Sequence, residues 1–207
     1  NVLLGNPMTK QELVRWAAEG ERVASGSVHA DNIAPSMIGG ITLVRSLEAD
    51  DIISLPVPSK MRLVLIHPHV EVKTSDARRV LPREIPLSTA IRQWSNTAAF
   101  VAGCQADDLS LIGRAMEDLV AEPARRSLIP YYGEVKSLAL EAGALGVSIS
   151  GAGPSILVLT DSLTISEKIS ATVKRLYRKQ RLGCDVWCTR IDKKGARIIP
   201  KIGRAHV

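Results

Sequence analysis

The glycine-rich segment Ser150–Ser155 has the composition of a turn that could bind an anion. Gly151 and Gly153 permit positive φ angles and carry no Cβ atom that would keep a ligand away from the backbone. Such a turn can direct several backbone N–H groups at one anion, and the hydroxyls of Ser150 and Ser155 would add donors. The alternative is a plain hairpin turn, because a glycine pattern alone is weak evidence of function.

A helix predicted over residues 9–24 carries a carboxylate on its apolar face. Thr9 and Glu12 have the spacing of a capping box, which predicts the start of the helix. Glu21 lies four residues after Ala17 and therefore on the same face. It also lies near the C-terminal end, where the helix dipole disfavours negative charge, so a bound cation would stabilise it. A solvated glutamate at a fraying helix end is the alternative.

The segment 25–32 consists of small and polar residues and is predicted to be a loop. It brings together three polar side chains, those of His29, Asp31 and Asn32. Such a cluster can form a binding site. The same residue types also serve as turn and cap residues, and the sequence leaves both interpretations open.

The elements around these residues divide the chain into two parts. A β-hairpin is predicted from strands 41–44 and 52–57, and the prolines that follow mark a boundary, which gives predicted domains 1–58 and 59–200. The second domain is predicted to contain strands 62–67, 184–191 and 196–199, a hairpin within 146–160, and helices 74–82 (capped by Thr74), 87–104, 107–121, 122–126, 131–142 and 165–180. This order of strands and helices is that of a ferredoxin-like α+β sandwich.

The composition is that of an ordinary globular protein with an aliphatic core. Of the 207 residues, 45% are hydrophobic and only 3% are aromatic, and no apolar run reaches the ~18–20 residues of a membrane span. Because the N-terminus also lacks the pattern of a signal peptide, the sequence predicts a soluble protein. The three cysteines are predicted to be small buried hydrophobes in a reducing compartment.

The net charge of +6 comes from basic residues that are dispersed along the chain, with small clusters at 174–181 and 193–197. Basic patches interleaved with aromatic residues are absent from the sequence. We therefore expect a small phosphorylated ligand rather than a nucleic acid as the anionic partner.

The two ends of the chain have unusual features. Residues 1–5 have the character of a helix already under way. Residues 201–207 are predicted to be a non-native tail, because the codons ATC-GGA-AGA-GCA-CAC-GTC of a sequencing adapter would encode its last six residues.

Four motifs, in this order, give the chain a family resemblance. They are GERVASGSVHADNIAPSMIGG (20–40), VKTSDARRVLP (72–82), EDLVAEPARRSLIP (117–130) and GVSISGAGPSILVL (146–159). With these motifs the chain resembles the homoserine kinases, which belong to the superfamily that also contains galactokinase and mevalonate kinase. The second and third motifs are specific to homoserine kinases, whereas the glycine-rich turn is shared by the superfamily.

The resemblance implies a two-domain fold, and one motif of the family is missing from the sequence. The first domain would be the remnant of an α/β nucleotide-binding domain, and the second a complete ferredoxin-like α+β domain. The family's phosphate loop, Pro-x-x-x-Gly-Leu-Gly-Ser-Ser-Ala, does not occur in the sequence and is expected upstream of Asn1. A fragment without this loop is expected to be inactive.

The resemblance also assigns roles to individual residues. It implies that Glu21 holds Mg²⁺, that the turn Ser150, Gly151, Ala152 and Gly153 closes the site near substrate and phosphate, and that the amino-acid substrate is contacted by His29, Thr74, Arg78, Arg125 and Gly151. The residue types suit that substrate, because paired guanidinium groups can bind a carboxylate in bidentate fashion. Its ammonium group would need oxygen acceptors, for which Asp31 and Asn32 are candidates.

The activity implied by the resemblance is ATP-dependent, Mg²⁺-assisted phosphorylation of the side-chain hydroxyl of L-homoserine, a step of threonine biosynthesis in the cytoplasm. No catalytic base can be assigned, neither nucleic acid nor membrane is expected as a partner, and a homodimer is left open. One alternative is a related kinase for a mevalonate-type or sugar substrate. Another is a non-catalytic ligand-sensing α+β module, in which Glu21 and the His29 segment would have no role.

Overall fold

A computed structural model of the chain describes residues 5–25, 28, 30–46 and 51–198. The chain forms two compact units, one from residues 57–191 and one from residues 1–56 together with 192–207. The first boundary lies two residues before the predicted one. The second differs more, because residues 192–198 belong to the same unit as the helices over residues 10–25 and 30–38.

The unit 57–191 is built on a four-stranded antiparallel sheet in the order β4-β5-β3-β6. Its strands are β3 (Arg62–Pro68), β4 (Gly146–Ile149), β5 (Ile156–Thr160) and β6 (Cys184–Thr189). The strand that comes first in this unit, β3, lies in the middle, between β5 and β6. This is the ferredoxin-like topology that the order of elements predicts, and the chain is an α+β protein.

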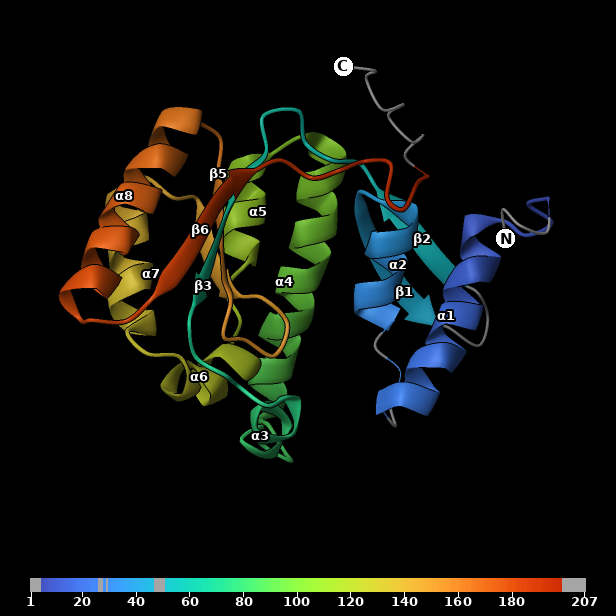
Figure 1. Cartoon of the computed structure of the whole chain (residues 1–207), viewed down its shortest axis with the longest axis horizontal. Helices are drawn as coiled ribbons and strands as arrows, with labels where there is room; N and C mark the ends of the chain where they lie inside the picture. The colour runs from blue at the N-terminus through green and yellow to red at the C-terminus, as the bar shows by residue number, and fades with distance from the viewer. Residues whose placement is uncertain (1–4, 26–27, 29, 47–50, 199–207) are drawn as a thin grey trace, which may run out of the picture. The chain divides into compact units, whose positions relative to one another are not determined.

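Helices α7 and α8 cover one face of the sheet (Figure 1). Val64 and Ile66 of β3, Val135 of α7 and Val173 of α8 are fully buried in a core that also contains Tyr132 and Tyr177. The helices of this unit are α3 (Thr74–Arg79), α4 (Leu87–Ala106), α5 (Leu109–Ala115), α6 (Ala121–Arg125), α7 (Tyr132–Glu141) and α8 (Leu163–Lys179), with a 3₁₀ turn at Arg126–Leu128. Valine and isoleucine supply most of this core, and such β-branched side chains pack well on a sheet.

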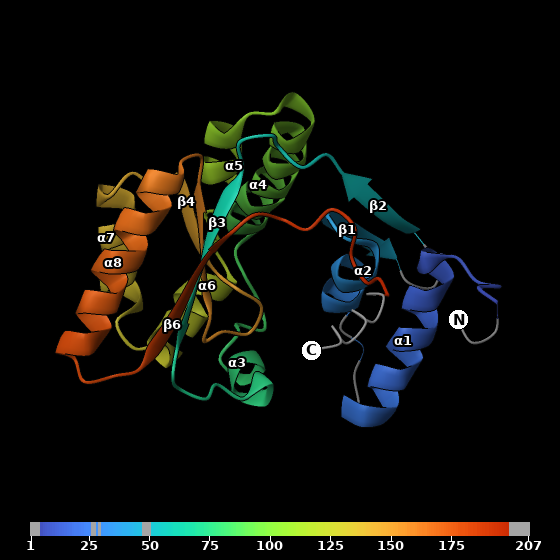
Figure 2. The same ribbon diagram turned by 45° about the horizontal axis from the view of Figure 1, so that its top comes forward.

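Helix α5 approaches the sheet so closely that its backbone touches the backbone before β4. A Cβ atom at Gly113 would lie 2.2 Å from the carbonyl oxygen of Leu145. Only glycine permits this approach. The hairpin of α4 and α5 is thereby held next to β4, as Figure 2 shows.

The other unit contains two helices and a two-stranded hairpin: α1 (Lys10–Ser25), α2 (Ala30–Ile38), β1 (Ile41–Ser46) and β2 (Asp51–Leu55). The capping box of α1 is confirmed, since Glu12 Oε2 accepts the N–H of Thr9 at 2.7 Å and Thr9 Oγ1 accepts the N–H of Glu12 at 3.2 Å. Small side chains dominate the buried surface of the helices, with Ala18 on α1 and Ala34 on α2.

The segment after residue 191 returns to α2 and β1. The N–H of Gly40 bonds to the carbonyl of Asp192 at 2.8 Å, and the N–H of Ala196 bonds to the carbonyl of Ser36 at 2.9 Å. Gly39 and Gly195 pack backbone to backbone, both at positive φ, and a Cβ at Gly39 would lie 2.4 Å from the nitrogen of Gly195. The strand predicted over 196–199 is wrong for its described residues, because 196–198 make no ladder with β1 or β2.

Three further predictions of local structure are corrected. The polar segment predicted as a loop becomes α2 from Ala30 onward, because Ala30 and Ala34 share a buried helical face and Pro35 is accommodated within the helix. The helix predicted over residues 107–121 is α5, and it ends at Ala115 instead of Ala121. The N-cap of α3 is Lys73, so Thr74 is its first residue and does not cap it.

His29 and residues 199–207, which include the predicted tail, lie outside the described residues. Among the helices that are described, none is long and apolar enough to span a bilayer.

Candidate active site

The glycine-rich turn joins β4 to β5 in a hairpin. The N–H of Ser150 bonds to the carbonyl of Ser155 at 2.8 Å, and the N–H of Gly153 bonds to the carbonyl of Ser150 at 3.1 Å. Gly151 has φ +60° and Gly153 has φ +86°, so both adopt the left-handed conformation that their lack of a side chain favours. A Cβ at Gly151 would meet no atom within 4 Å, which leaves the backbone of the turn approachable from that side.

The hydroxyl of Ser155 is engaged by the sheet. Its Oγ lies 2.9 Å from Nδ1 of His67, near the end of β3. An open depression of about 510 Å³ lies beside this contact, between Pro154 of the turn and the segment that leads from β3 towards α3. The residues that line it are His67, His69, Val70, Glu71, Val72 and Pro154. The sequence contains no local signal for His67, because its partner is 88 residues away.

Helix α3 presents Thr74 and Arg78 on one exposed face, four residues apart, while Ala77 is fully buried. The two predicted substrate-binding residues of this helix therefore lie on the same exposed side of α3. Residues 74 and 78 need the helix itself to be held in place, because six residues are too few for a stable isolated helix.

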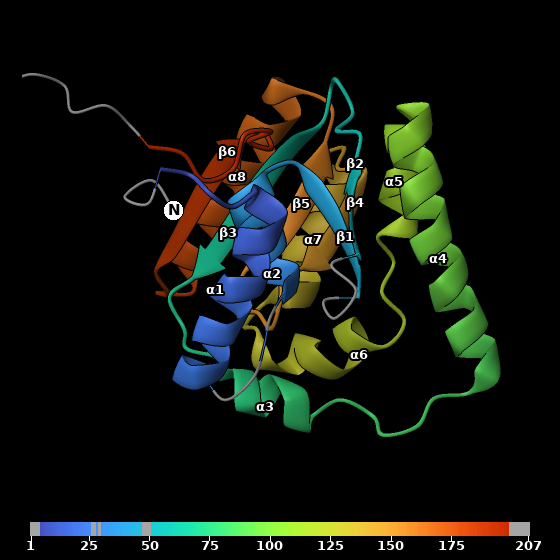
Figure 3. The same cartoon turned by 90° about the vertical axis from the view of Figure 1, so that its right-hand side faces the viewer.

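Arg125, the last residue of α6, connects α3 to the glycine-rich turn. Its Nε donates to the carbonyl of Ala77 at 3.0 Å, and its Nη1 donates to the carbonyl of Gly151 at 3.0 Å. The carbonyl of Ala77 is one of those at the C-terminal end of α3 that have no partner within the helix, and a guanidinium is a favourable partner there. One side chain thus brings three of the predicted segments together; α3 and α6 also lie side by side in Figure 3.

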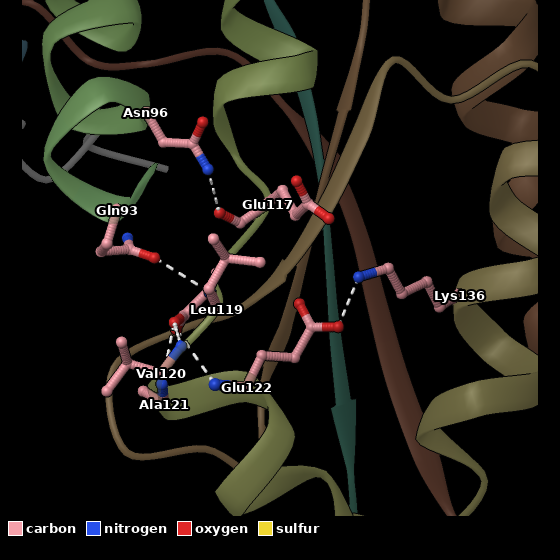
Figure 4. A network of polar contacts seen from close by, with 9 residues as sticks. Gln93, Asn96, Glu117, Leu119, Val120, Ala121, Glu122 and Lys136 are labelled. Atoms are coloured by element: carbon pink, nitrogen blue, oxygen red, sulfur yellow. Dashed lines mark hydrogen bonds and ion pairs between the residues drawn. The ribbon is translucent and has the colours of Figure 1, made fainter. Parts of the chain in front are cut away.

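Sequence reasoning missed the polar contacts that hold α6. Among the residues that the structure describes, Glu122 is the one charged residue that is buried, at 8% exposure, and it forms an ion pair with Lys136 of α7. Asp118 accepts hydrogen bonds from three backbone N–H groups at the start of α6. Figure 4 shows these contacts together with those of Gln93 and Asn96. Burial and the neighbouring Glu122 carboxylate raise the pKa of Tyr132, which keeps its hydroxyl protonated.

Three of the site residues predicted in the other unit are described, and they lie on two helices. Glu21 is half-buried near the C-terminal end of α1, and Asp31 and Asn32 are exposed in the first turn of α2. Among the described residues, no group of three or more His, Cys, Asp or Glu side chains could hold a metal ion. A single carboxylate such as Glu21 still suits Mg²⁺, which commonly takes one or two carboxylates together with phosphate oxygens and water.

All three cysteines are free thiols, but only Cys104 is buried; Cys184 is half-buried and Cys188 is exposed on β6. The prediction of buried cysteines is therefore confirmed for Cys104 alone. Burial raises the pKa of Cys184 to about 11, so its thiol stays protonated at neutral pH. A protonated thiol is neither a nucleophile nor a metal ligand, and this argues against a catalytic role.

Comparison with known proteins first defines the class. Residues 100–179 match the family described as "GHMP kinases C terminal". This region runs from within α4 through α6, strand β4, the glycine-rich turn and strand β5 to the end of α8, and therefore contains Arg125 and Gly151. Over these residues the chain is similar to the C-terminal domain of the GHMP kinases.

The relatives then identify the branch. The chain is 50% identical to the homoserine kinase of Chloroherpeton thalassium over 200 residues, which is 96% of this chain and 63% of the relative. It is 50% identical to the homoserine kinase of Chlorobaculum tepidum over 201 residues, covering 96% and 62%. It superposes on the crystal structure of homoserine kinase from Cytophaga hutchinsonii with a TM-score of 0.93 and 48% identity, covering 96% and 63%.

The chain is therefore a homologue of the homoserine kinases. It spans somewhat less than two thirds of the length of the curated relatives that it matches.

Proposed function

We propose that the protein to which this chain belongs transfers the γ-phosphate of ATP to the side-chain hydroxyl of L-homoserine. The relatives named as homoserine kinases support this assignment, since they match 96% of the chain. The structural observation that carries it is the pair of hydrogen bonds that the Arg125 side chain donates to the carbonyls of Ala77 and Gly151. It joins the helix proposed to bind the amino acid to the turn proposed to lie near the phosphate.

The residues divide the work as follows. Arg78 and Thr74 bind the substrate from the exposed face of α3, with the guanidinium paired to the carboxylate. His29, Asp31 and Asn32, which belong to the other unit, are also proposed to contact the substrate. The backbone of the turn Ser150–Gly153 faces the transferred phosphoryl group, where fixed N–H dipoles stabilise developing charge.

Glu21 is the residue that we propose to hold Mg²⁺. When bound, the ion neutralises charge on the phosphate oxygens of ATP. The carboxylate is a hard oxygen ligand, and its place at the C-terminal end of α1, where the dipole is negative, favours a nearby cation.

The test uses the protein encoded by the complete open reading frame, with L-homoserine, mevalonate and galactose as acceptors and ADP formation as the readout. We expect turnover with homoserine and none with the other two. Preference for mevalonate or galactose would assign a related kinase, and absence of turnover with all three would favour the non-catalytic module.

Arg78→Lys sharpens this test. Lysine keeps the charge but loses the forked geometry, and ~1.5–3 kcal/mol of charged hydrogen bonding raises the homoserine KM about tenfold or more, with little change in the KM for ATP. Arg79→Lys is the matched control, because Arg79 is exposed and paired with Asp76 within the same helix. An unchanged homoserine KM in Arg78→Lys would show that Arg78 does not bind the substrate.

A further inference from the structure

Helix α6 is too short to hold its own position. It has five residues, Ala121–Arg125, and isolated helices of fewer than about 12 residues are unstable in water. Its last residue nevertheless makes two long-range hydrogen bonds that need a defined geometry, to Ala77 and to Gly151. The orientation of Arg125 must therefore come from contacts made elsewhere on α6.

The first of these contacts is at the N-terminal end of the helix. Asp118 Oδ1 accepts the N–H groups of Val120 and Ala121, both at 2.8 Å, and Oδ2 accepts that of Glu122 at 3.1 Å. One carboxylate thus satisfies three N–H groups at a helix start, where negative charge is favoured.

The segment that carries Asp118 is itself tied to α4. Gln93 Oε1 accepts the N–H of Leu119 at 2.9 Å, and Asn96 Nδ2 donates to the carbonyl of Glu117 at 2.8 Å (Figure 4). Asp118 is therefore held from both sides along the chain.

The second contact ties α6 to α7. The side chain of Glu122 is 11% exposed and that of Lys136 is 28% exposed, and the two form an ion pair. Lys136 follows Val135, which is fully buried in the core under the sheet. Because Glu122 lies three residues before Arg125, both project from neighbouring positions on one side of α6. A shift of Glu122 would thus displace the guanidinium.

We propose that Asp118, Glu122 and Lys136 are positioning residues for the substrate site. They act through Arg125: they set the axis of α6 so that its guanidinium holds α3 and the glycine-rich turn at the separation that the substrate needs. This inference rests on the proposed function. It adds three residues to which the proposed function assigns no contact with substrate or phosphate.

The main experiment compares two capping carboxylates in the complete protein. Asp118→Ala removes the cap of α6. Asp108→Ala is the matched control, because Asp108 Oδ1 caps α5 by accepting the N–H of Leu111 at 2.9 Å, and α5 carries no proposed site residue. Thermal melting and the KM values for homoserine and ATP are measured for both.

We expect both variants to melt at lower temperature, and only Asp118→Ala to lose kcat/KM for homoserine, by about tenfold or more, with the KM for ATP changed less than about twofold. If both variants show the same loss of melting temperature and keep their homoserine kinetics, the inference is overturned. Asp118 would then only stabilise the start of α6. An inactive wild-type protein would instead reject the proposed function, and the inference with it.

The ion pair supplies a second measurement if Asp118→Ala does not fold. Glu122→Gln, Lys136→Met and the double variant form a thermodynamic cycle on kcat/KM for homoserine, and Lys136→Arg restores the charge. We expect each single variant to lower kcat/KM about tenfold, the double variant to lose less than the product of the two, and Lys136→Arg to recover most of the activity. Independent losses with no recovery by arginine would show that the pair does not act through Arg125.

Discussion

The unit 57–191 and the unit formed by the two ends of the chain hold their candidate site residues by different means. In the first, a continuous aliphatic core fixes the sheet, and polar contacts between residues far apart in sequence fix α6 and Arg125. In the second, the side-chain pairs within α1, Thr9–Glu12 and Glu19–Arg22, are exposed and local. Its long-range hydrogen bonds include that of Lys10 to the carbonyl of Lys194, which lies at an exposed position, and its buried helix residues are mostly alanines.

The difference indicates where the site is preorganised. Long-range contacts between partly buried groups constrain the relative positions of elements, whereas exposed contacts three residues apart stabilise only one helix. Arg78, Arg125 and Gly151 should therefore keep their arrangement without a ligand. The positions of Glu21 and Asp31 depend on the smaller core between the helices of the other unit.

The largest expected effect separates the two cores. Val64 of β3 and Val14 of α1 are both fully buried, and each is changed to alanine. We expect Val64→Ala to lower the free energy of unfolding of its unit by about 3 kcal/mol and Val14→Ala by about 1 kcal/mol, because the alanine-rich surroundings of Val14 lose fewer packing contacts.

Urea unfolding followed by single-tryptophan fluorescence distinguishes the units, since Trp16 lies on α1 whereas Trp94 and Trp187 lie in the other unit. Equal losses for the two valines would remove the contrast between the cores.

The next effect concerns the turn itself. Gly151→Val strains a residue at φ +60°, which costs about 2 kcal/mol, although its Cβ meets open space. In the complete protein we expect activity per folded molecule to fall far more than stability, because displaced N–H groups no longer meet the developing charge.

Gly113→Ala is the control for the turn, because its Cβ would clash with the backbone of Leu145 and destabilise α5 without touching the site. Melting curves and kinetics on both variants decide the matter. Normal activity per folded molecule in Gly151→Val would make the turn a purely structural one.

A smaller effect should stay within one unit. Thr9→Ala removes half of the capping box and should destabilise α1 by about 1 kcal/mol. The transition reported by Trp16 should move to lower urea, and the one reported by Trp187 should stay in place. Movement of both transitions by the same amount would show that the two units unfold as one.

The last effect is a pH dependence confined to the unit 57–191. Burial raises the pKa of Cys184 from about 9 to about 11, so the folded state binds this proton more tightly than the unfolded chain. Stability from this source is complete below pH 9 and is lost as the pH rises towards 11.

The difference between wild type and Cys184→Ala, measured from pH 8 to 11, isolates this contribution from those of the tyrosines. A difference that does not change with pH would mean that the thiol is not shielded.

Local sequence patterns predict most elements of this protein correctly. The alternation in β4, the apolar runs of β3 and β5, and the amphipathic spacing of α8 determine strands and helices, because the periods of 2 and 3.6 residues are properties of the backbone. The order of these elements then leaves few topologies for the sheet, and the ferredoxin-like one is observed. Gly151 and Gly153 could likewise be chosen from sequence, since positive φ favours glycine.

Only the tertiary structure determines what Arg125 contacts, that Glu122 pairs with Lys136, and that residues 192–198 return to α2. The acceptors of Arg125 are backbone carbonyls at Ala77 and Gly151, and every residue has such a carbonyl, so no side-chain pattern can identify them. The packing of Gly39 on Gly195 is equally hidden, because it depends on two backbones that meet 156 residues apart in the chain. Periodicity is local information, whereas these contacts are decided by which surfaces the packed core brings together.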